Sequence, residues 1–187
     1  MSTYTPPAPT RVPATAARPW RLGGRTRKSV LLLHIASAGA WLGIDVVMGV
    51  LVFTALFTDS DRTKAVSYQA LEMFAVWPLL STGLVCLATG VLLGLGSKYG
   101  LVRFWWVAVK LVLNIVLTTL VLFALRPGVV EAAERGRDLL AGGSPALAPG
   151  DLLFPPIVST SAVLFAMVLS VFKPWGRIRR RTNEGSA

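Results

Sequence analysis

The chain has 187 residues, of which 53% are hydrophobic and 15% charged, and its mean hydropathy is +0.61. This composition excludes an ordinary soluble globular protein and is typical of a membrane protein with one domain. The formal net charge of +10 does not indicate nucleic-acid binding, because the basic residues flank hydrophobic segments and do not form a basic face with interleaved aromatic residues. Cys86 is the only cysteine, so neither an intrachain disulfide nor a thiolate metal cluster can form.

The first predicted element is a disordered basic cytoplasmic tail, residues 1–28. This stretch is rich in proline, threonine, alanine and arginine and contains no apolar run, so it cannot bury enough apolar surface to offset the entropy lost on ordering. A second basic cytoplasmic tail is predicted for residues 174–187, after the last hydrophobic segment.

Four hydrophobic segments follow the first tail, and each has the length of about 20 apolar residues that a membrane-spanning helix needs. They cover residues 29–57, 73–96, 104–125 and 152–172. We expect short polar loops between them, with a short surface helix in the third loop, where Glu131 and Arg135 have the i,i+4 spacing of a helical ion pair. The predicted fold class is all-α: a polytopic membrane protein whose residues 29–173 form a four-transmembrane-helix bundle.

The distribution of lysine and arginine predicts the orientation of this bundle. Thirteen of these residues lie before the first segment, between the second and third, or after the fourth. Five lie in the other two loops, together with seven of the nine acidic residues. Because loops rich in basic residues stay in the cytoplasm, we expect both termini there, in a multi-pass protein of a bacterial-type inner (cytoplasmic) membrane.

Three ionisable side chains fall inside the predicted spanning segments: His34, Asp45 and Lys110. Such a group at the centre of a bilayer costs about 2.5–3.5 kcal/mol on insertion scales, so each is a candidate for function. At about 1.5 Å per residue, His34 lies roughly 9 Å past Lys28. Lys110 lies about 10 Å past Arg103, so both groups reach a similar depth from the cytoplasmic boundary.

Three more residues approach this depth. Met167 reaches it on the fourth segment, Gly90 on the second, and Asn114 lies one turn beyond Lys110 on the same face of the third. A glycine lets a neighbouring backbone or a flat ligand approach closely. The sequence therefore predicts a shared inner-leaflet pocket lined by these three residues, His34 and Lys110.

Each ionisable residue has a structural alternative. His34 can be a neutral imidazole hydrogen-bonded to a neighbouring helix, and Lys110 can extend its ammonium group toward the headgroups. Asp45 can pair with Arg126 or bond to serine and threonine hydroxyls. Asp45 also shares a helical stripe with His34 and Trp41, which is expected to face the bundle interior.

A single histidine limits metal chemistry. A tetrahedral zinc or copper site needs several His, Cys or carboxylate ligands close together, and a haem with two axial histidines cannot form within one subunit. The axial arrangements left for haem iron are His34 alone, or His34 with Met167, Lys110, water or the His34 of a second copy.

Three short motifs, one on each of the first three segments, carry a family resemblance. They consist of Leu33, His34, Trp41 and Gly43; of Pro78, Thr82 and Gly83; and of Trp106, Lys110 and Leu111. They resemble the corresponding helices of HemJ-type protoporphyrinogen oxidases and of the CopD-like superfamily of four-helix integral membrane proteins, or a branch of it with another reaction.

The resemblance implies a haem b or porphyrin site. In those oxidases the histidine that matches His34 is regarded as the haem ligand, and the lysine that matches Lys110 as functional. The chain departs from them in having no further histidine in residues 111–125 and in carrying Asp45.

Two functions from different classes are predicted. The first is a haem-b-binding or porphyrin-handling protein, an oxidoreductase if it is an enzyme, in which His34 is the axial ligand, Lys110 binds an anionic group, and a porphyrin or quinone is the partner. The alternative is a non-catalytic membrane accessory or small transport component, in which these residues join helices. Proton or ion conduction along His34, Trp41 and Asp45 is a third hypothesis. Lipid is the expected surrounding, nucleic acid is not an expected partner, and glycine-rich faces permit a homo-oligomer.

Overall fold

The computed structural model describes residues 22–96, 101, 104–143 and 152–172. The regular secondary structure of this part of the chain is helical, and four of its helical stretches are long and apolar enough to cross a membrane. The predicted all-α fold with four transmembrane helices is therefore confirmed, and the protein is a multi-pass membrane protein. The second predicted tail, and residues 1–21 of the first, lie outside the described residues.

Helix α1, Gly24–Phe57, begins five residues before the predicted segment. Its 34 residues rise about 51 Å, which exceeds the roughly 30 Å of a hydrocarbon core, so α1 extends beyond the bilayer. Its buried residues recur every three or four positions: Ser37, Trp41, Asp45, Met48, Val52 and Ala55. One face of α1 therefore packs into the bundle, and it includes the predicted stripe at Trp41 and Asp45.

The first predicted loop is helical for most of its length. Helix α2, Asp61–Phe74, follows Ser60, whose hydroxyl accepts a hydrogen bond from the backbone amide three residues on, at 3.3 Å. Helix α3, Val76–Leu95, continues from α2 after one intervening residue and is the second spanning helix. The structure differs from the predicted polar loop because α2 is amphipathic, with one buried face that hydropathy alone does not register. That face consists of Ala65, Ser67, Tyr68 and Leu71.

The third spanning helix continues past its predicted end. Helix α4, Trp105–Leu120, passes without a break into a π-helical turn, η1, Val121–Leu125, and then into α5, Arg126–Leu140. Pro127, in the first turn of α5, lacks the N–H that an α-helix would bond to the carbonyl of Phe123. The π turn therefore lies where the regular hydrogen-bond ladder is interrupted.

Helix α5 packs against α2 beyond the spanning region. The predicted short surface helix is the end of this longer helix, and the predicted ion pair between Glu131 and Arg135 is present. A Cβ atom on Gly136 would lie 3.0 Å from the carbonyl oxygen of Ala65, so the two helices approach closely there. The two helices thus form one helical pair at the end of the bundle.

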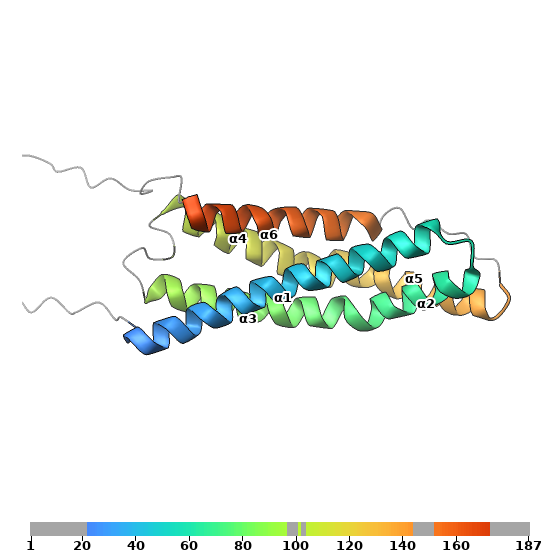
Figure 1. The fold of residues 1–187 in the computed structure, drawn as a ribbon, viewed down its shortest axis with the longest axis horizontal. Helices are drawn as coiled ribbons and strands as arrows, with labels where there is room; N and C mark the ends of the chain where they lie inside the picture. The colour runs from blue at the N-terminus through green and yellow to red at the C-terminus, as the bar shows by residue number, and fades with distance from the viewer. Residues whose placement is uncertain (1–21, 97–100, 102–103, 144–151, 173–187) are drawn as a thin grey trace, which may run out of the picture.

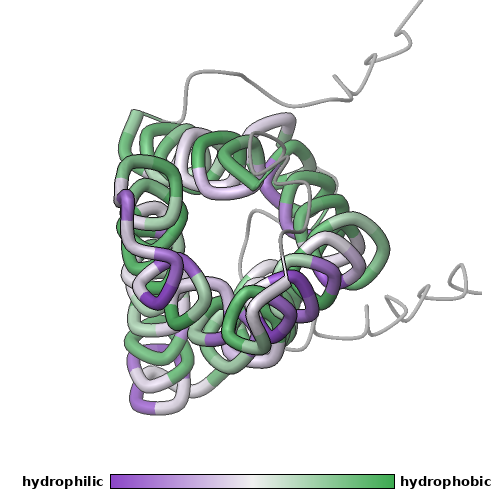
Figure 2. Tube along the Cα trace, turned by 90° about the vertical axis from the view of Figure 1, so that its right-hand side faces the viewer, coloured by the Kyte–Doolittle hydropathy of each residue, from purple (hydrophilic) through white to green (hydrophobic). Residues whose placement is uncertain are grey.

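Helix α6, Phe154–Phe172, completes the bundle. Helices α1 and α4 each pack against both α3 and α6, so the four spanning helices form a ring of antiparallel neighbours (Figures 1 and 2). The start of α1 and the end of α6 lie at one end of this bundle, and α2 and α5 lie at the other (Figure 1). Both ends of the described chain are thus on one side of the membrane. That this side is the cytoplasm remains a prediction from the basic residues.

The outside of the bundle is strongly apolar, as the hydropathy colouring in Figure 2 shows. Leu32, Phe123 and Val171 are 70%, 77% and 74% exposed, respectively. Soluble proteins rarely expose contiguous apolar surface on this scale, whereas lipid tails solvate it. Inside, apolar residues such as Met48 and Leu79 form a core between the helices.

Candidate functional site

His34 lies on α1, half-buried against α3. Its Nδ1 atom is 3.0 Å from the carbonyl oxygen of Cys86 and 3.0 Å from the hydroxyl oxygen of Thr89. Because a carbonyl oxygen can only accept a hydrogen bond, this geometry assigns the proton to Nδ1 and the lone pair of a neutral imidazole to Nε2. Nε2 makes no hydrogen bond with any described residue, so its lone pair is open to another group.

Gly90 lies beside His34. A Cβ atom at position 90 would be 3.2 Å from Cε1 and 3.7 Å from Nδ1 of His34. The first of these distances is tighter than ordinary van der Waals contact, so the missing side chain lets the imidazole lie against α3. In this structure the flat group that Gly90 accommodates is the imidazole itself.

Lys110 lies on α4 and reaches toward α6. Its Nζ atom donates a hydrogen bond to the hydroxyl of Ser170 at 2.9 Å and lies 4.7 Å from the centroid of the Trp106 ring. The ammonium group is also close enough to His34 and Cys86 to interact with both electrostatically. Lys110 therefore faces the bundle at the level of His34, as the depth estimate predicts.

The two remaining residues of the predicted pocket also belong to α4 and α6. Asn114 accepts a hydrogen bond from Thr118 on its own helix at 3.4 Å and is a hydrogen-bonding neighbour of the Cys86 thiol. Met167 is half-buried on α6, one turn before Ser170. No described contact joins Met167 to His34. The structure thus pairs His34 with Gly90 between α1 and α3, and places Lys110, Asn114 and Met167 on the opposite helices.

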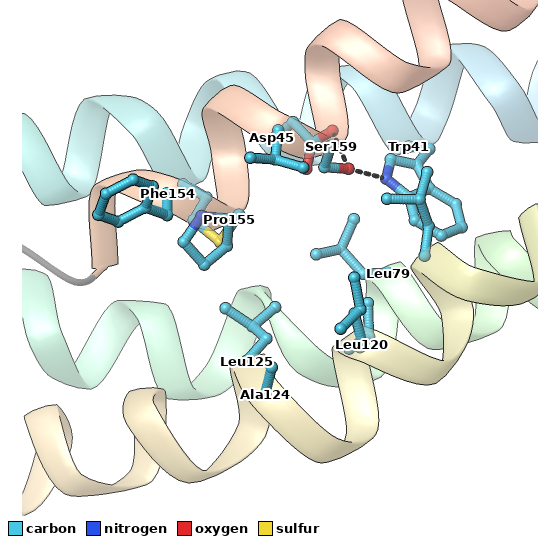
Figure 3. A pocket seen from close by; sticks show the side chains of 13 residues that line it. Trp41, Asp45, Leu79, Leu120, Ala124, Leu125, Phe154, Pro155 and Ser159 are labelled. Carbon is cyan, nitrogen blue, oxygen red and sulfur yellow. Dashed lines mark hydrogen bonds between the residues drawn. The ribbon is translucent and has the colours of Figure 1, made fainter. Parts of the chain in front are cut away.

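A second polar group lies deeper in the bundle, around Asp45 (Figure 3). Trp41 donates through Nε1 to the hydroxyl oxygen of Ser159 at 2.7 Å, and that hydroxyl donates to Oδ2 of Asp45 at 2.8 Å. Asp45 is 1% exposed, and its Oδ1 atom is buried without a hydrogen-bond partner among the described residues. Of the two structural alternatives for Asp45, the bond to a serine hydroxyl is observed. No ion pair with Arg126 is found in the described part of the chain.

This group borders a cavity of about 190 Å³ between α1, α3, α6 and the π turn. Trp41, Asp45 and Ser159 line one side of it, and apolar residues line the rest. The sequence singled out Trp41 and Asp45 by their one-turn spacing. It could not identify Ser159, because a serine on a spanning helix carries no sign of which helix it faces.

No three histidine, cysteine, aspartate or glutamate side chains among the described residues are close enough to hold a metal ion between them. A metal at His34 would therefore have to arrive inside a ligand of its own, as iron does in a porphyrin.

No family model, curated protein or solved structure matches this chain. The resemblance to the HemJ-type oxidases therefore stays a prediction, and the functional argument rests on the residues themselves.

Proposed function

We propose that this integral membrane protein binds haem b or a closely related iron porphyrin, with Nε2 of His34 as an axial ligand. The observation that supports the proposal is the hydrogen bond from Nδ1 of His34 to the carbonyl of Cys86. Histidines that bind metals commonly donate their other ring nitrogen to a carbonyl or carboxylate, which fixes the tautomer and the orientation of the ring. The motifs shared with HemJ-type oxidases point to the same residue.

The remaining residues of the pocket have roles that follow from their chemistry. The ammonium group of Lys110 pairs with a propionate by exchanging its bond to Ser170 for a charge-assisted one. Asn114 offers a further donor on the same helix, and Met167 is the candidate for the opposite axial position. Bound haem would supply one-electron redox chemistry.

The test is the visible absorption spectrum of detergent-purified protein, oxidised and dithionite-reduced, from cells with ample haem. We expect a Soret band and sharp reduced α and β bands, both absent in His34→Ala. Thr89→Val is the matched control, because it removes one partner of Nδ1 and leaves the Cys86 carbonyl in place. A featureless wild-type spectrum, or an unchanged spectrum in His34→Ala, would refute the proposal.

A non-catalytic accessory role is the second candidate, and the interhelical contacts favour it. His34 joins α1 to α3, and Lys110 joins α4 to α6. On this hypothesis the protein binds no haem, and His34→Ala and Lys110→Met lower only the stability of the bundle. Unfolding measured alongside the spectrum separates the two functions.

A further inference from the structure

The cavity beside Asp45 has a chemistry of its own, which does not depend on the proposed haem site. Two of its polar groups, Trp41 and Ser159, are already committed to each other and to Oδ2 of Asp45. Oδ1 accepts no hydrogen bond from a described residue, although a carboxylate oxygen has two lone pairs to satisfy. The unmet hydrogen-bonding capacity at this site is therefore that of an acceptor.

Asp45 also lacks a counter-charge. The ion pairs of the described chain lie near its surface, between Lys64 and Asp61, Arg135 and Glu131, and Arg137 and Glu72, and none includes Asp45. An ionised carboxylate in an apolar interior is costly unless a positive group or several donors face it. Carboxylates inside membrane proteins accordingly serve as counter-ions for ligands as well as for other side chains.

The lining of the cavity selects the kind of cation. A bare metal cation such as Ca²⁺ takes about six to eight oxygen ligands. Asp45 and Ser159 supply the only side-chain oxygens among the described lining residues. The rest of the wall is apolar, including Leu79 and Phe154, and Trp41 adds an aromatic ring that can attract a cation. An organic ammonium with an apolar body matches this wall, whereas a metal ion or a hydrated cation does not.

The volume limits the size of that body. An apolar cavity of about 150 Å³ takes up benzene. The cavity beside Asp45, at about 190 Å³, has room for one six-membered ring and a short aminoalkyl group.

The cavity is also open to the membrane. Ala124 on the π turn and Phe154 and Val158 on α6 line it and are exposed on the outer surface of the bundle. Figure 3 shows Phe154 and Pro155 on one side of the space and Ala124 and Leu125 on the other. The π turn therefore forms one wall, as π turns often do at functional sites. A lipophilic molecule dissolved in the bilayer can enter between α6 and η1.

From these observations we propose that the cavity binds a small lipophilic amine, whose ammonium group donates a hydrogen bond to Oδ1 of Asp45 while its apolar body fills the space between α6 and the π turn.

The experiment is isothermal titration of the full-length protein in lipid nanodiscs, with empty nanodiscs subtracted to correct for partition into lipid. The probes are benzylamine, which is cationic at neutral pH, and benzyl alcohol, its neutral counterpart of nearly the same shape. Asp45→Asn removes the charge at nearly constant side-chain volume. Asp59→Asn, on the exposed turn before α2, is the control for loss of a negative charge elsewhere.

Wild-type protein and Asp59→Asn should bind benzylamine at least about tenfold more tightly than benzyl alcohol, and Asp45→Asn should lose that preference. Equal binding of the two probes by wild-type protein, or no saturable binding of benzylamine, would overturn the proposal. If Asp45→Asn does not fold, Ala124→Leu fills the open side of the cavity and should abolish benzylamine binding. Undiminished binding by Ala124→Leu would also overturn the proposal.

Discussion

The indole of Trp41 on α1 lies directly over Gly83 on α3. A Cβ atom at position 83 would overlap Cζ3 of Trp41 and would lie 2.9 Å from the hydroxyl of Thr118 on α4. Because a buried indole between three helices has no free direction of movement, the contact requires glycine. Gly83 thereby fixes the position of the tryptophan that begins the hydrogen-bonded chain to Asp45.

Gly83→Ala should therefore destabilise the bundle by about 1–3 kcal/mol, the usual cost of forcing extra volume into a packed interior. Gly43→Ala, on α1, is the matched control, because a Cβ atom there meets nothing within 4 Å. Its stability should stay within about 1 kcal/mol of wild type. Unfolding in mixed detergent and SDS measures both. Equal losses in the two variants would contradict the packing argument.

Lys110→Met should weaken haem binding by about tenfold, because it removes the charge proposed to pair with a propionate. Ser170→Ala breaks the same hydrogen bond between α4 and α6 but keeps the ammonium group. It should therefore retain haem. Haem content per protein, read from the Soret absorbance, checks both variants. If they lose haem to the same extent, Lys110 acts by joining the helices and not by binding the cofactor.

Ser159→Ala should cost about 1–3 kcal/mol of stability, because it leaves Oδ2 of Asp45 without its donor and Nε1 of Trp41 without its acceptor. In an Asp45→Asn background the same substitution should cost less, since no buried charge is then left unpaired. A double-mutant cycle on the free energy of unfolding gives the coupling. Strict additivity would show that the chain is not energetically connected.

Cysteine labelling tests the orientation of the bundle. Cys86 is buried and should not react with a membrane-impermeant maleimide in intact cells. Asp59→Cys lies on the exposed turn before α2, and Arg25→Cys lies in the exposed first turn of α1. If the basic residues are cytoplasmic, only Asp59→Cys is labelled until the cells are opened. Labelling of Arg25→Cys alone in intact cells would reverse the predicted orientation.

The spanning helices could be predicted from the sequence because the bilayer imposes a simple requirement on length and apolar content. Helices α2 and α5 escaped that reading. Their apolar residues occupy one face only, so a search for apolar runs assigns them to loops. Their pairing depends on the close contact between Gly136 and Ala65, which are far apart in the sequence.

The candidate sites were predictable to the extent that single residues reveal themselves. His34, Asp45 and Lys110 stand out because an ionisable group in lipid needs a reason. The partners of these groups do not stand out: Thr89, Ser159 and Ser170 are ordinary polar residues of spanning helices, and only the packing of one helix on another shows which group each one meets. The cavity is likewise a property of the space between helices and of no residue alone.

The π turn has one more consequence, for the rotational phase of the third spanning helix. Its buried residues Leu117, Val121, Leu125 and Val129 recur at intervals of four. In a regular α-helix such a stripe drifts around the axis by about 40° at each interval. The wider turn absorbs much of this drift, so the face that meets α3 inside the membrane is continuous with the face that meets α2 beyond it. A chain one residue shorter between 121 and 125 would rotate α5 by about 100°, so the protruding helix pair would lose its register while the other three spanning helices kept their length.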